Sequence, residues 1–156
     1  MDEDNFISDE EELYRSVRKL SEIDSEYIYD DTGHLIFTKD AFRDQKKEPS
    51  VDRAKLRNFN PSLSKLSETD GIVSLITKEV RSIGKIETKG DVKNLSHAVD
   101  VIYNPIHDEH ENLAHSLITV EPKFFGSENK QKKAFKLLRI ALARLATQRG
   151  WKLEPK

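Results

Sequence analysis

The 156-residue sequence contains no cysteine. Without thiolates, the chain cannot form a disulfide, an iron–sulfur cluster, a cysteine nucleophile or a zinc ribbon, and any metal would need histidine or carboxylate ligands. No run approaches the roughly 18 consecutive apolar residues that span a membrane, and no basic segment followed by an apolar run begins the chain. We therefore expect a cytoplasmic protein with no membrane association and no cofactor.

Charged residues are abundant, at 35% of the chain, against 36% hydrophobic residues. The length suits one domain, so we expect a flexible acidic tail over residues 1–7 and a single globular domain over residues 8–156. A formal net charge of -2 hides a polarity, because the first 12 residues include seven acidic ones and the last 27 include nine basic ones. This polarity favours a charged partner without identifying it.

Hydrophobic patterning predicts an α+β fold in which a mostly antiparallel sheet is covered by an N-terminal helix and a longer C-terminal helix. Ser8 and Glu11 have the spacing of a capping box, and Leu13, Val17 and Leu20 recur at helical spacing. These positions predict a helix that begins near residue 9.

Several segments have the composition of strands. Residues 26–29 and 34–38 flank a turn with Gly33 and predict a hairpin, and apolar or β-branched runs predict further strands over 71–76, 85–88, 98–103 and 113–120. Ser50 is a candidate cap for a short helix through Leu56. Residues 129–148, followed by Gly150, predict the one long helix.

The long helix carries the strongest indication of binding. An apolar face is accompanied by basic residues, and the candidate contacts for a partner are Lys132, Lys133, Lys136, Arg139 and Arg144. Such a face can simply be solvated, can neutralise the phosphates of nucleic acid, or can meet an acidic protein or the chain's own N-terminal tail. The leading hypothesis is a small binding or accessory protein that uses this helix to contact nucleic acid or an acidic partner.

The competing hypothesis is a small toxin-like hydrolase or transferase. His115 sits within an apolar strand, where it is either a hydrogen-bonded structural residue or an acid–base group, with Arg15 or His97 assisting. An enzyme would place His115 in a concave pocket beside another polar group, whereas a binding module would pack His115 and expose the basic helix.

Two short segments near the start bear on the enzyme hypothesis. Leu13-Tyr14-Arg15 and the stretch from Phe37-Thr38 to Phe42 resemble the opening of ADP-ribosyltransferase-like toxin domains. The resemblance implies an early arginine paired with a hydroxyl-bearing strand, and it leaves the completing glutamate or histidine unplaced.

The loop over residues 104–112 combines His107 and His110 with carboxylates, which are suitable ligands for Zn²⁺ or Mn²⁺. The spacing matches no helical HExxH arrangement, and polar loops are ordinarily solvated. We therefore expect a solvated loop and no metal site.

Overall fold

The computed structural model describes residues 5–19 and 25–156. Within these residues, antiparallel strands form a seven-stranded sheet in the order β6-β7-β8-β4-β1-β5-β9. The strands are β1 (Glu12–Val17), β4 (Ser50–Arg53), β5 (Gly71–Ile76), β6 (Lys85–Thr88), β7 (Leu95–Tyr103), β8 (His115–Glu121) and β9 (Trp151–Leu153). The α+β class, the antiparallel sheet and the strands expected at 71–76, 85–88, 98–103 and 113–120 are confirmed.

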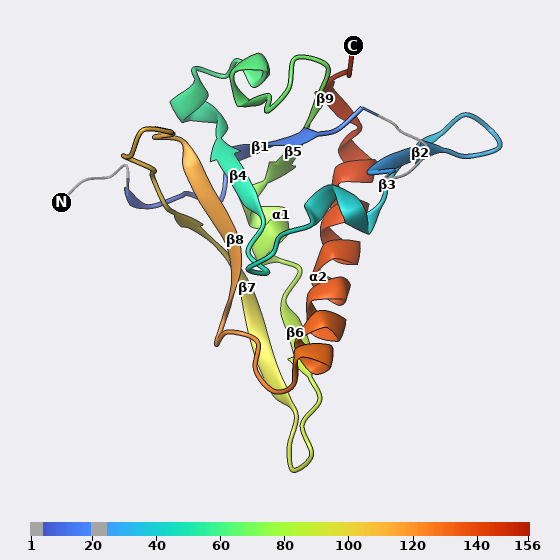
Figure 1. Ribbon diagram of the computed structural model, residues 1–156, viewed down its shortest axis with the longest axis vertical. Helices are drawn as coiled ribbons and strands as arrows, with labels where there is room; N and C mark the ends of the chain where they lie inside the picture. Colours follow the sequence, from blue (N-terminus) through green and yellow to red (C-terminus); the bar gives the residue numbers. More distant parts are fainter. Residues whose placement is uncertain (1–4, 20–24) are drawn as a thin grey trace.

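The long helix α2 (Glu128–Arg149) covers one face of this sheet (Figure 1). The Ser127 hydroxyl accepts a hydrogen bond from the Lys130 amide at its start, and Gly150, with φ +75°, ends it. Ala134, Leu138 and Leu142 pack against sheet residues in one apolar core. The predicted C-terminal helix is thus confirmed, and among the described residues no helix is long and apolar enough to cross a membrane.

The predicted hairpin also forms, as a separate two-stranded sheet of β2 (Tyr27–Tyr29) and β3 (Leu35–Phe37) with Gly33 at φ +84° in the turn. It lies beside the C-terminal half of α2, where the Phe37 amide donates to the Thr147 hydroxyl at 2.9 Å. Trp151 packs edge-on against Tyr27 and Phe37. The remaining short elements are α1 (Thr77–Arg81) and the 3-10 helices η2 (Lys39–Phe42), η3 (Ala54–Arg57) and η4 (Pro61–Ser64).

The predicted N-terminal helix is wrong, because residues 12–17 form strand β1 inside the sheet, between β4 and β5. Leu13 and Val17 are four residues apart, a spacing that places both side chains on one side of a strand as well as of a helix. The Ser8 amide does donate to the Glu11 carboxylate at 2.8 Å, but this contact closes a turn that precedes a strand. Leu20 lies outside the described residues.

The segment after Ser50 also differs from the prediction. Ser50–Arg53 is strand β4, inserted between β8 and β1, and only then does η3 follow. Arg53 is fully buried and bonds both carboxylate oxygens of Glu11, at 2.8 and 2.9 Å. Pairing with distant strands therefore decides the conformation of β1 and β4, and these two strands carry much of the site described next.

Candidate functional site

A row of polar side chains crosses the face of the sheet that lies opposite α2. His115, Asp52, Tyr14 and Ser74 are successive partners across β8, β4, β1 and β5. Because side chains alternate along a strand, their apolar neighbours turn to the other face, where they pack with α2. The four strands thus build the main apolar core on one side. On the other side, which we call the polar face, the row of polar side chains lies beside a smaller apolar cluster of Tyr14, Ala54 and Ile72.

Ser50 and His115 form a hydrogen-bonded pair on this polar face. The Ser50 Oγ atom lies 3.1 Å from His115 Nε2, and His115 Nδ1 lies 2.7 Å from the carbonyl oxygen of Asn104. A carbonyl can only accept, so the proton of neutral His115 resides on Nδ1 and leaves Nε2 to accept from the Ser50 hydroxyl. This is the arrangement in which an imidazole takes a proton from a serine.

Asp52 ties together the two loops that flank this pair. One carboxylate oxygen accepts from the Asn112 side chain at 2.9 Å, and the other accepts from Arg57 Nε at 3.1 Å and from the Ser64 hydroxyl at 2.7 Å. Asn112 belongs to the β7–β8 loop, while Arg57 and Ser64 belong to η3 and η4. Asp52 is nearly buried, so these bonds fix the loops in position beside Ser50 and His115.

The loops and strands enclose a pocket of about 330 Å³, which we call the Ser50–His115 pocket. It opens because β1 pairs with β4 through two residues only, whereas β1 pairs with β5 through six, so β1 and β4 diverge. Apolar lining comes from Leu63, Leu66 and Ile106, and the charged lining among the described residues consists of Arg15, Arg57 and Lys65 against Asp52. The excess of cations favours an anionic ligand.

Arg15 fills the gap where β1 and β4 separate. Its guanidinium donates to three carbonyl oxygens, those of Ala41 at 2.6 Å, Ser50 at 2.7 Å and Arg43 at 3.0 Å. Burial lowers the pKa of Arg15 to about 10, a shift opposed by Glu26 and Asp44, so the group stays charged at neutral pH. Arg15 therefore anchors the backbone of Ser50 and brings a positive charge to the site.

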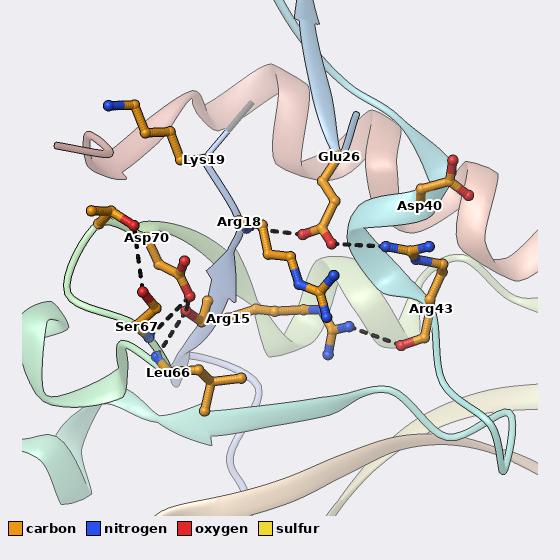
Figure 2. Close-up of a pocket in the computed structure, with 11 residues that line it drawn as sticks. Arg15, Arg18, Lys19, Glu26, Asp40, Arg43, Leu66, Ser67 and Asp70 are labelled. Atoms are coloured by element: carbon orange, nitrogen blue, oxygen red, sulfur yellow. Dashed lines mark hydrogen bonds and ion pairs between the residues drawn. The ribbon is translucent and has the colours of Figure 1, made fainter. Parts of the chain in front are cut away.

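A second, open pocket of about 630 Å³ adjoins the first and shares Arg15, Ser16 and Leu66 with it. Figure 2 shows Arg15, Arg18 and Arg43 gathered on one side of this pocket, with Glu26 next to them. The Glu26 carboxylate accepts from the Arg18 amide at 3.0 Å and from Arg43 Nη2 at 3.2 Å. Asp70 accepts from the Ser16 hydroxyl at 2.7 Å, which fixes the opposite wall.

The sequence-predicted enzyme residues divide between two places. His115 and Arg15 line the same pocket. His97 is fully buried elsewhere, at 2.7 Å from the Thr88 hydroxyl and beside the Pro122 carbonyl, with Phe124 packed against its ring. His97 therefore has the structural role of a buried histidine with both ring nitrogens satisfied, and it does not join the other two.

The predicted binding residues lie on α2, across the sheet from His115. Four of them are exposed, namely Lys132, Lys133, Lys136 and Arg144. Arg139 differs, because it is half-buried over the Phe135 ring and lies 3.7 Å from Asp40. Burial lowers the pKa of the Arg139 guanidinium, while Asp40 opposes that shift.

The histidine-rich loop is closed by a reciprocal pair of backbone hydrogen bonds between Ile106 and Asn112, both 2.9 Å long. Its carboxylates and histidines are exposed, and His110 lies at the rim of the Ser50–His115 pocket. In residues 5–19 and 25–156, no three histidine or carboxylate side chains are grouped so that they can hold a metal ion.

Ser50, Asp52 and Asn112 were missed by the sequence reasoning, which assigned Ser50 to a helix cap. Nothing local singles them out, since Ser50 and Asp52 become neighbours of His115 only through the pairing of β4 with β8, and Asn112 bonds Asp52 only across that pairing. Comparison of the chain with protein-family models, curated proteins and solved structures finds no match. The geometry of the site is therefore the basis for a functional argument.

Proposed function

We propose that this protein is a small hydrolase or group transferase in which Ser50 is the nucleophile and His115 the general base. The observation that carries the proposal is the 3.1 Å contact between Ser50 Oγ and His115 Nε2 inside a pocket lined by cations. A structural histidine that merely satisfies its hydrogen bonds has no need of a concave surface with excess positive charge.

The residues support a balanced two-step reaction. Ser50 Oγ bonds to the electrophilic carbon or phosphorus atom while its proton moves to His115 Nε2. The bond between that atom and the leaving-group oxygen breaks, and the same proton passes to the departing oxygen. In the second step His115 takes a proton from water or another acceptor hydroxyl, whose oxygen bonds to the same carbon or phosphorus atom. The bond from that atom to Ser50 Oγ breaks, and the proton returns to the serine oxygen. Throughout, the Asn104 carbonyl holds Nδ1–H and steadies the imidazole.

The lining of the pocket restricts the substrate. Arg15, Arg57 and Lys65 outnumber Asp52, so an ester that carries a negative charge is favoured over a neutral one. Leu63, Leu66 and Ile106 offer apolar contact for the remainder of such a molecule. We therefore assign the substrate to the class of small anionic esters, either phosphoesters or carboxylic esters that bear an acidic group.

The test measures nitrophenol release from p-nitrophenyl phosphate, bis(p-nitrophenyl) phosphate and p-nitrophenyl acetate, together with mass-spectrometric mapping of fluorophosphonate adducts. We expect turnover of an anionic ester, an adduct on Ser50, and a loss of rate of at least about 100-fold in Ser50→Ala and His115→Gln. Ser96→Ala and His107→Gln are matched controls, because both side chains are exposed outside the pocket.

Equal rates in the site variants and the controls would overturn the proposal. So would the combination of no turnover and no adduct on Ser50 in the wild-type protein. Thermal unfolding of each variant distinguishes a loss of chemistry from a loss of folded protein.

A further inference from the structure

The exposed face of α2 carries a group of basic side chains that the proposed reaction does not use. We infer that it binds the phosphate backbone of duplex nucleic acid, through Lys132, Lys133, Lys136 and Arg144. This inference is independent of the proposed reaction, because α2 covers the face of the sheet opposite Ser50 and His115.

The four cations gather on one side of the helix. With 3.6 residues per turn they fall within an arc of about 120°, and at a rise of 1.5 Å per residue Lys132 and Arg144 are about 18 Å apart along the axis. All four side chains are exposed. In the described part of the chain none of them lies within ion-pair distance of a carboxylate, whereas Lys130 and Arg139 on the same helix pair with Asp91 and Asp40.

The helix sequence keeps this field uncompensated. After Glu128, no acidic residue occurs through Arg149, and Glu128 itself lies 3.0 Å from Lys47 and interacts electrostatically with Lys132 alone among the four cations. Protein surfaces that contact only solvent ordinarily carry acidic and basic side chains together. A face that carries only basic side chains over about three helical turns therefore favours an anionic partner. Phosphates along a duplex supply negative charge at regular spacing, and lysines release their counterions on contact.

The side chains between the cations distinguish duplex from single strand. Leu137 is about half exposed, and Phe135, the only aromatic residue of α2, is buried. Proteins that hold single strands stack unpaired bases on exposed aromatic rings, and this face has none. Contacts to the phosphates of the duplex, without contacts to its bases, also imply that binding does not depend on the nucleotide sequence.

The experiment is a fluorescence-anisotropy titration of a labelled mixed-sequence DNA duplex, and of one of its single strands, at salt concentrations from about 50 to about 200 mM. We expect the wild-type protein to bind the duplex more tightly than the single strand. For Lys133→Glu/Lys136→Glu, we expect duplex affinity to fall at least about tenfold at low salt and the slope of log K against log salt to shrink by about 2.

The matched control is Lys78→Glu/Lys85→Glu, which makes the same change in net charge at exposed lysines outside α2. We expect this control to retain wild-type binding within about threefold, because phosphate contacts act over about a Debye length. An equal loss in both variants, tighter binding to the single strand, or no duplex binding at about 50 mM salt would each overturn the inference. The last result would leave a solvated face or an acidic partner as the alternatives.

Discussion

His115 Nε2 lies 3.1 Å from the hydroxyl oxygen of Ser50, although the two residues are 65 positions apart in the chain. Their strands, β8 and β4, are adjacent and antiparallel, with Asp52 opposite His115 and Ser50 opposite Leu117. The pair is therefore held by two rigid strands of a central sheet, as an acid–base site requires.

The first prediction concerns the tautomer of His115. Because Nδ1 faces the Asn104 carbonyl at 2.7 Å, the neutral ring should carry its proton on Nδ1. Nitrogen-15 NMR of labelled protein, recorded where the ring is neutral, measures the protonation of each ring nitrogen. The Ser50→Ala variant should keep the same tautomer, since the Asn104 contact is unchanged. A proton found mainly on Nε2 would contradict both the geometry and the proposed role as a base.

The second prediction concerns the buried ion pair between Glu11 and Arg53. Arg53 is 0% exposed, and removal of its partner leaves a buried charge that β4 cannot move into water. We expect Glu11→Leu to lower the free energy of unfolding by about 3–5 kcal/mol in urea titrations. The double variant Glu11→Leu/Arg53→Met should recover most of that loss, because no charge then remains buried. A single variant as stable as the wild-type protein would contradict this account.

The third prediction concerns acid sensitivity. Burial acts to raise the pKa of Glu48, but hydrogen bonds from Lys123 and Thr119 outweigh it and hold the pKa below its ordinary value of 4.5. A carboxylate with a lower pKa in the folded state stabilises that state above the unfolded pKa, and this stabilisation is lost as the pH falls through the folded pKa. The pKa of Glu11 is also lowered. Burial acts to raise it, but hydrogen bonds from Arg53 and the Ser8 amide outweigh that effect.

Urea unfolding between about pH 5 and about pH 3 tests this linkage. The wild-type protein should lose stability steadily over that range, and Glu48→Gln should lose less because its side chain no longer titrates. Glu87→Gln, on the exposed side of β6, is the control and should follow the wild-type curve. A Glu48→Gln curve parallel to that of the wild-type protein would show that Glu48 does not contribute.

The sequence by itself determined the elements with strong local patterns. The β-branched runs of β5, β7 and β8, the glycine turn between β2 and β3, and the long α2 with Gly150 at its end all form where their residues predict. The basic face of α2 could be predicted for the same reason, because helical periodicity places Lys132 and Lys136 on one side without reference to the rest of the chain.

Tertiary structure alone decided β1, β4 and the candidate site. The spacing of Leu13 and Val17 fits a strand and a helix equally well, and pairing with Gly71–Ile76 of β5 settles the choice. No local sequence pattern marks Ser50, Asp52 or Asn112 as site residues. Each joins the site through a hydrogen bond to a residue 60 or more positions away or through the pairing of β4 with β8. Local propensity acts over a few residues, whereas a sheet joins residues from distant parts of the chain, so the sequence could suggest His115 and Arg15 but could not supply the serine between them.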